Sequence, residues 1–215
     1  MPVLTQVDLT LEIEASPETV WGILTTPELF SIWMEGQVEF EPRPGSPFRA
    51  AFPHIHTVIA GEVVTLDADT RHLGLTWGIE SGHNAEAFPA GSSLVEFRVH
   101  EADSGCRVEL THSKLPSGAI ADGQRGGWGF HLSKMALYAN RTDLERGLER
   151  TLPEWFAAWG ETDPAARQEI LARCCADDIG FRDDWTVAVG IDALNQHIAM
   201  CFQFMPGWKL ESTGE

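Results

Sequence analysis

The chain has 215 residues, of which 43% are hydrophobic and 22% charged, a composition typical of a globular protein. Its 15 basic and 32 acidic residues give a formal net charge of −17, so we expect no binding to nucleic acid or to an anionic membrane surface. No apolar run approaches the roughly 18 residues that a membrane-spanning helix needs, and the first residues lack the basic-then-apolar pattern of a signal peptide. The four cysteines form no Cys-x-x-Cys pair, which favours reduced thiols and a cytoplasmic location.

The N-terminal residues predict one strand followed by two short helices. Residues 3–14 are expected to form a half-buried antiparallel strand, because apolar and polar residues alternate strictly from Val7 to Glu14. Two helix-start signals follow, Ser16-Pro17-Glu18 and Thr26-Pro27-Glu28, each with a capping hydroxyl, a proline at the first helical position and an acid in the first turn. They predict helices that end near residues 24 and 34.

The middle of the chain predicts a series of strands and then one long helix. Runs rich in β-branched and aromatic residues, separated by turn residues, predict strands at 38–41, 48–52, 57–66, 72–79, 94–101 and 107–115. After a loop at 116–127, a helix is expected from residue 128 to about residue 150, with Trp128, Leu132, Met135 and Ala139 on one stripe. A single antiparallel sheet must bury one face, and this helix is the only long amphipathic element available to cover it. The predicted fold class is therefore α+β, a curved antiparallel sheet wrapped around a long C-terminal helix (the helix-grip arrangement).

The character of the chain changes near residue 151. We expect a first domain at 1–150 and a second, short α+β segment at 151–215. Within the second segment, helices are predicted at 153–159, 163–175 and 191–200, and short strands at 179–181 and 185–189.

The first 150 residues resemble the SRPBCC superfamily of START-like helix-grip proteins. The nearest branch is the AHSA type, named for the activator of a heat-shock chaperone ATPase. The resemblance implies the helix-grip fold, but no single activity, because the superfamily includes binding proteins, cyclases and co-chaperones. The motifs that support it are Ala15-Ser16-Pro17-Glu18-Thr19-Val20-Trp21, Thr25-Thr26-Pro27-Glu28, Gly61-Glu62-Val63-Val64, Leu73-Gly74-Leu75-Thr76-Trp77, Leu110-Thr111-His112-Ser113 and Gly126-Gly127-Trp128.

Residues 152–210 resemble the first half of a SnoaL-like cone, the fold of nuclear-transport-factor-like proteins. The motifs are Trp155-Phe156-Ala157-Ala158-Trp159, Asp163-Pro164, Cys175-Ala176-Asp177-Asp178-Ile179 and Gly190-Ile191-Asp192-Ala193-Leu194. A complete cone needs about twice this length, so the segment is expected to pack on the first domain or to be completed by a homodimer partner.

A set of large apolar side chains and two histidines defines the candidate ligand site. Bulky rings of this kind suit the wall of an apolar cavity, although they are equally able to fill a core. His112 shares the inward face of the last strand and His131 lies near the start of the long helix, where an imidazole can orient a ligand or exchange a proton; a buried, hydrogen-bonded histidine is the alternative for both. The predicted cavity residues are Trp33, Phe52, Trp77, Phe97, His112, Trp128, His131 and Met135.

Other candidate sites are weaker. His54-x-His56 on a strand has a spacing that some zinc sites use, but no third ligand is evident, so these histidines are more readily explained as lying at a loop edge or cavity mouth. The aspartate pairs at 177–178 and 183–184 are expected to be surface or capping residues. We therefore predict no metal, no cofactor and no identified catalytic residue.

Three functions follow from these patterns. The leading hypothesis is a protein that binds a small hydrophobic or aromatic ligand in the cavity between sheet and helix. The second is a polyketide cyclase-like or hydrolase-like enzyme that uses the cavity histidines. The third is an interaction module such as a chaperone regulator, which needs an exposed apolar patch instead of a pocket.

Overall fold

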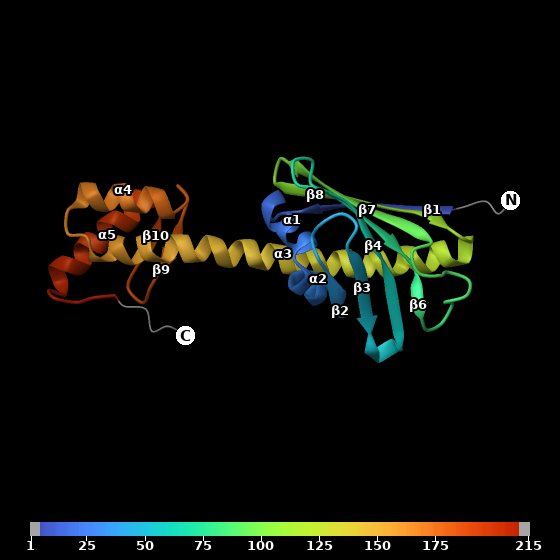
Figure 1. Cartoon of the computed structure of the whole chain (residues 1–215). Helices are drawn as coiled ribbons and strands as arrows, with labels where there is room; N and C mark the ends of the chain where they lie inside the picture. Colours follow the sequence, from blue (N-terminus) through green and yellow to red (C-terminus); the bar gives the residue numbers. More distant parts are fainter. Residues whose placement is uncertain (1–4, 211–215) are drawn as a thin grey trace. The chain divides into compact units, whose positions relative to one another are not determined.

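The computed structural model describes residues 5–210, and the chain divides into two compact units between Leu144 and Glu145 (Figure 1). The division falls inside the long helix α3 (Gly118–Gly160). Among residues 5–210, none of the helices is both long and apolar enough to cross a bilayer.

The first unit is built on an eight-stranded antiparallel sheet. The order along the sheet is β1-β8-β7-β5-β4-β3-β2, and the short strand β6 pairs with β4. Residues 3 and 4 of the predicted first strand lie outside the described residues. The strands are β1 (Thr5–Ile13), β2 (Gln37–Phe40), β3 (Pro47–Phe52), β4 (Thr57–Asp67), β5 (His72–Trp77), β6 (Ile79–Ser81), β7 (Ser93–Ala102) and β8 (Gly105–Leu115).

Two short helices follow β1, as predicted: α1 (Pro17–Thr25) and α2 (Pro27–Met34). The hydroxyl of Ser16 accepts a hydrogen bond from the backbone N–H of Thr19 at 3.3 Å. Asp143 of α3 reinforces this cap, because its Oδ1 accepts from the hydroxyls of Ser16 at 3.0 Å and of Thr19 at 2.6 Å. The carboxylate of Asp143 on the long helix thus stabilises the N-terminus of α1.

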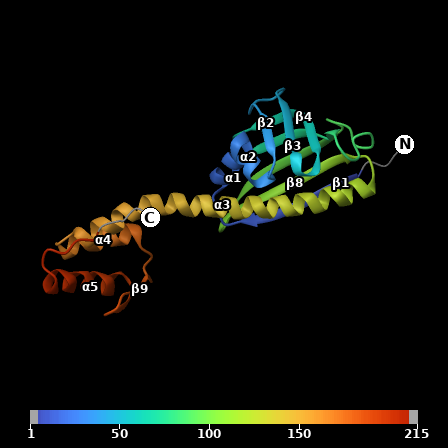
Figure 2. The same ribbon diagram turned by 90° about the horizontal axis from the view of Figure 1, so that it is seen from below.

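The long helix α3 packs against the sheet of the first unit, which confirms the helix-grip class (Figure 2). Its buried stripe is the predicted one: Trp128, Leu132, Met135 and Ala139 are at most 3% exposed. The helix begins at Gly118, so the expectation of a loop was wrong for residues 118–127. Burial of Ala121 on the same face extends the helix through a segment whose glycines disfavour it.

The second unit forms a small core of its own. It contains the end of α3, then α4 (Pro164–Cys174), the hairpin of β9 (Gly180–Arg182) and β10 (Val187–Val189), and α5 (Ile191–Phe204). The helix expected to start at residue 153 is not separate, because Pro153 lies inside α3. The Arg167 side chain is buried, with its Nε donating to Oδ1 of Asn195 at 2.6 Å and Nη1 donating to the carbonyl of Glu161 at 2.7 Å.

Candidate functional site

A pocket of about 290 Å³ opens beside the first half of α3. Its walls come from the end of α2, strands β3 and β4, the 3-10 turn η1 (Pro53–Ile55), the β5–β6 segment and α3. Proline at 53 ends the strand and starts this turn, which places residues 54 and 55 at the pocket. The lining residues are Met34, Glu35, Phe52, His54, Ile55, Thr57, Ile59, Trp77, Ile79, Gln124, Gly127, Trp128, Phe130 and His131.

Four of the eight predicted cavity residues line this pocket: Phe52, Trp77, Trp128 and His131. The other four, Trp33, Phe97, His112 and Met135, are at most 1% exposed and belong to the packed interior between sheet and helix. Aromatic rings fill that interior at ring-centroid distances such as 6.4 Å for Trp33 with Phe97 and 5.6 Å for Phe97 with Trp128. Open space therefore lies at one end of the helix-grip rather than along its whole length.

His112 is fully engaged by the protein. Trp128 donates its indole N–H to Nδ1 of His112 at 3.0 Å, and because an indole only donates, Nδ1 must be the unprotonated nitrogen. Nε2 therefore carries the proton and donates to the Ser93 hydroxyl at 2.8 Å, and that hydroxyl donates to the Trp77 carbonyl at 2.8 Å. Burial lowers the pKa of His112 to about 3, so the ring is neutral at physiological pH. His112 thus holds the indole of Trp128 directly and, through Ser93, the backbone of Trp77.

The polar residues of the pocket lie at its mouth. Nδ1 of His131 is 3.4 Å from the carbonyl of Trp33, which can only accept, so the proton of this contact is on Nδ1 and Nε2 remains an acceptor. Burial lowers the pKa of His131, which also favours the neutral ring. Glu35, which has a left-handed backbone with φ of 52°, forms an ion pair with Lys134 that lowers the pKa of its carboxyl.

The indole N–H of Trp77 has no hydrogen-bond acceptor among residues 5–210, although the side chain is 3% exposed and lines the pocket. A buried donor without an acceptor costs about 1–3 kcal/mol. The indole N–H groups of Trp33, Trp159 and Trp208 are also buried without an acceptor in the described part of the chain, and Trp77 is the one of the four that lines this pocket.

Of the two histidines considered for a metal site, His54 lines this pocket and His56 does not. His54 and His56 are exposed and lie in and after the turn η1, so the expectation that they share a strand was wrong, because Pro53 interrupts it. Across residues 5–210, groups of three or more His, Cys, Asp or Glu side chains that could hold a metal ion do not occur.

Sequence reasoning missed most of the pocket mouth. Glu35, Gln124, Gly127 and Phe130 were not predicted as site residues; Gln124 and Gly127 fell in the expected loop and Phe130 in the expected helix. The proline at 53 was the available signal, because it stops the strand at the pocket and brings the following residues into a turn.

The sheet, the two short helices and the long helix define a START-like helix-grip protein with a pocket at one end. A family model described as activator of Hsp90 ATPase homolog 1-like protein matches residues 14–140, and the chain belongs to this family. The match ends before the second unit, so it gives no support to the resemblance to a SnoaL-like cone that was expected for residues 152–210. No curated protein matches the chain.

Solved structures show the same fold. Protein MLL2253 from Mesorhizobium loti is 25% identical, with a TM-score of 0.57, over 65% of this chain and 99% of its own. The Aha1 dimer from Colwellia psychrerythraea is 17% identical, with a TM-score of 0.52, over 63% and 96%. DynU16, from the dynemicin biosynthetic locus, is 17% identical, with a TM-score of 0.51, over 62% of this chain and 46% of its own.

Proposed function

We propose that the first unit binds a small apolar molecule that carries a hydrogen-bond acceptor, in the pocket beside α3. The observation that supports this best is the indole N–H of Trp77, which is buried at the pocket without an acceptor in the described part of the chain. A ligand carbonyl or ether oxygen would accept this hydrogen bond, while Phe52, Ile59 and Ile79 cover the apolar part of the ligand. Each 100 Å² of apolar area removed from water contributes roughly 2.5 kcal/mol.

The size of the pocket limits the ligand. A volume of about 290 Å³ lies just below the range typical of small-molecule sites, roughly 300–1,000 Å³. This favours a ligand of one or two rings. The polar mouth, with His131 and Gln124, then meets whatever polar substituent remains in contact with water.

Gly127 provides a direct test, because it lines the pocket and an added Cβ would meet no atom within 4 Å. In the Gly127→Leu variant the new side chain occupies the pocket, while the helix gains up to about 1 kcal/mol from the loss of glycine. Gly123→Leu is the matched control, since Gly123 is equally free of neighbours on the same helix but does not line the pocket.

Isothermal titration with 2-acetylnaphthalene, and with 2-ethylnaphthalene as the analogue without the carbonyl, measures the binding. We expect the ketone to bind more tightly than the hydrocarbon. Gly127→Leu should weaken the ketone at least tenfold, whereas Gly123→Leu should change its Kd by less than twofold. Equal affinities for both compounds, or equal effects of the two variants, would contradict the proposal.

An enzymatic role of the same pocket has one supporting observation, the pair of imidazoles from His54 and His131 among its lining residues. A cyclase or hydrolase needs two convergent polar groups, and His112 is not available because both of its nitrogens are bonded within the protein. His131→Gln distinguishes the roles: a catalytic histidine predicts loss of turnover of a bound substrate with little change in its Kd.

The interaction-module alternative rests on a row of exposed apolar side chains along α3, of which Phe130 also lines the pocket. Phe130, Leu137 and Leu144 are 56%, 73% and 65% exposed and follow one another at intervals of one heptad. A partner protein or a second copy packed there would be released by Leu137→Glu, and sedimentation analysis of the variant measures this. The ligand pocket should be unaffected, since Leu137 does not line it.

A further inference from the structure

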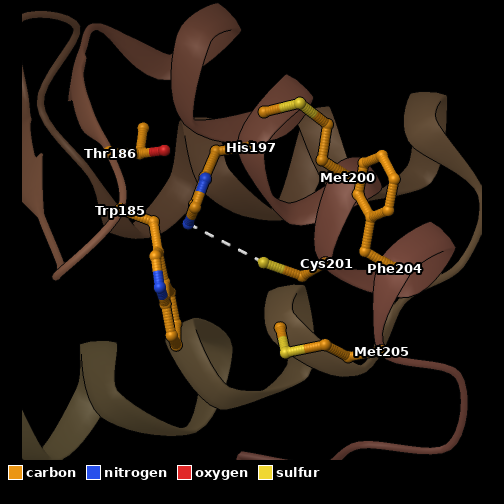
Figure 3. Close-up of a pocket in the computed structure, with 7 residues that line it drawn as sticks. All are labelled: Trp185, Thr186, His197, Met200, Cys201, Phe204 and Met205. Atoms are coloured by element: carbon orange, nitrogen blue, oxygen red, sulfur yellow. Dashed lines mark hydrogen bonds between the residues drawn. The ribbon is translucent and has the colours of Figure 1, made fainter.

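The second unit contains a pocket of its own, of about 280 Å³ (Figure 3). Trp185 and Thr186, just before β10, form one side, and four residues of α5 with the Met205 that follows form the other. Almost all of the lining surface is apolar, and Trp185, Phe204 and Met200 expose 79%, 74% and 45% of their surface. His197 and the hydroxyl of Thr186 are the principal polar groups.

One ring nitrogen of His197 is left without a partner. Nε2 lies 2.8 Å from Oδ2 of Asp183, so it carries a proton and donates it to the carboxylate. Asp183 is fixed for this contact, because its other oxygen accepts from the backbone N–H groups of Trp185 at 2.9 Å and Thr186 at 2.6 Å. Nδ1 is buried and has no partner among residues 5–210, on a side chain that is 4% exposed and lines the pocket.

The neighbouring thiol does not satisfy the imidazole. Sγ of Cys201 is 3.7 Å from Nε2, the nitrogen that already serves Asp183 (dashed line in Figure 3). Burial raises the pKa of Cys201, so the group is a thiol at physiological pH and not a nucleophilic thiolate. The arrangement therefore suits binding better than thiol chemistry.

We propose that this pocket is a second binding site, for a small neutral aromatic alcohol whose hydroxyl is hydrogen-bonded to Nδ1 of His197. A hydroxyl both donates and accepts, so it matches Nδ1 whether the imidazole is neutral or protonated. The site lies outside the residues that match the family model, and it is independent of the ligand pocket in the first unit.

The surrounding side chains select this class of ligand. Methionine sulfur makes favourable contacts with aromatic rings and adapts to their shape, and two methionines and two aromatic rings line the pocket. The volume is nearly twice that of the roughly 150 Å³ apolar cavity that holds benzene, so a two-ring compound fits. Asp183 and the adjacent exposed Asp184 repel carboxylates and phosphates, so the ligand is expected to be neutral.

The test compares 1-naphthol with naphthalene, which has the same ring system without the hydroxyl, on the full-length protein. The NMR resonance of the Trp185 indole N–H reports binding in this pocket alone, because that ring lines only the second unit's pocket. One net hydrogen bond should make 1-naphthol bind roughly threefold to tenfold more tightly. In His197→Phe this advantage should disappear, while the affinity for naphthalene stays within twofold.

Two exposed positions provide matched variants. Phe204→Glu introduces a carboxylate at this pocket and should weaken the binding of both compounds at least tenfold. Ile55→Glu introduces a carboxylate at the pocket of the first unit, where Ile55 is 58% exposed. This second variant should change neither titration followed at Trp185. Both are surface positions, so the comparison remains informative if His197→Phe does not fold. Equal binding of the two compounds by the unmodified protein would overturn the proposal. The proposal would also be overturned if sedimentation showed a dimer that Phe204→Glu dissociates and whose stability is unchanged by 1-naphthol.

Discussion

The hydrogen-bond chain through His112 leads to a quantitative prediction for the His112→Phe variant. Phenylalanine preserves most of the ring volume but removes both nitrogens, so the indole N–H of Trp128 becomes a buried donor without an acceptor and the Ser93 hydroxyl loses one of its two bonds. An orphaned buried donor costs about 1–3 kcal/mol and a lost net hydrogen bond about 1 kcal/mol. We therefore expect the first unit to lose roughly 2–4 kcal/mol of unfolding free energy.

Hydrogen exchange of the amides in β7 and β8 measures this loss in the first unit by itself, since Val95 of β7 lies opposite His112 in the register of this strand pair. The double variant His112→Phe with Trp128→Phe removes the orphaned donor as well. It should therefore lose less free energy than the sum of the two single variants. Additive effects, or a loss below about 1 kcal/mol in His112→Phe, would refute the role assigned to the chain.

His112 also makes the stability of the first unit depend on pH. The pKa of His112 is lowered from its ordinary 6.5 to about 3 in the folded protein, so between these values the unfolded chain binds more protons than the folded one. The stability contributed by the neutral ring is complete above pH 6.5 and falls as the pH is lowered toward 3, with a slope of at most about 1.4 kcal/mol per pH unit. In His112→Phe this component of the slope should be absent from the pH dependence of exchange.

Three further predictions concern stability. Asp143→Ala removes the carboxylate that caps α1 and should cost about 1–2 kcal/mol, seen as faster hydrogen exchange in that helix. Gly61→Ala should prevent the first unit from folding normally, since the new Cβ would lie 1.9 Å from the carbonyl oxygen of Thr76, and loss of the dispersed amide NMR spectrum of the sheet would show it. Arg167→Ala should destabilise the second unit by about 2–4 kcal/mol, because the Asn195 side chain and the carbonyl of Glu161 each lose a hydrogen-bond donor. Denaturant unfolding followed at Trp159 would detect this loss, with Arg173→Ala as an exposed control.

The fold was predictable because its signals are local. The alternation after Val7, the Ser-Pro-Glu and Thr-Pro-Glu starts and the apolar stripe of the long helix each specify one element, and the requirement to bury one sheet face then leaves few arrangements. The start of α3 was missed because glycines at 123, 126 and 127 disfavour a helix by about 1 kcal/mol each, and only the packed sheet shows that burial of Ala121 and Trp128 outweighs them.

The pocket residues were harder to predict from the sequence than the fold was. Trp77 and Phe97 look alike in a linear pattern, because both are inward residues of neighbouring strands, yet only Trp77 reaches the pocket. Which aromatic side chains fill the core and which border open space depends on the curvature of the sheet and on the turn at 53–55. Likewise, that His112 is a structural acceptor follows from the distance to one indole, which no spacing rule supplies.

The two sides of the pocket in the first unit differ in how firmly they are held. The backbone carbonyl of Trp77 and the indole of Trp128 are joined through Ser93 and His112 in one hydrogen-bond chain across β5, β7, β8 and α3, whereas the turn at 53–55 is exposed. Substitutions of Trp77 or Trp128 are therefore expected to lower the stability of the first unit, whereas substitutions in the turn should change only the shape of the pocket. For the ligand binding that we propose, directed evolution of specificity should accordingly succeed at Ile55 and its neighbours, with Trp77 and Trp128 left unchanged.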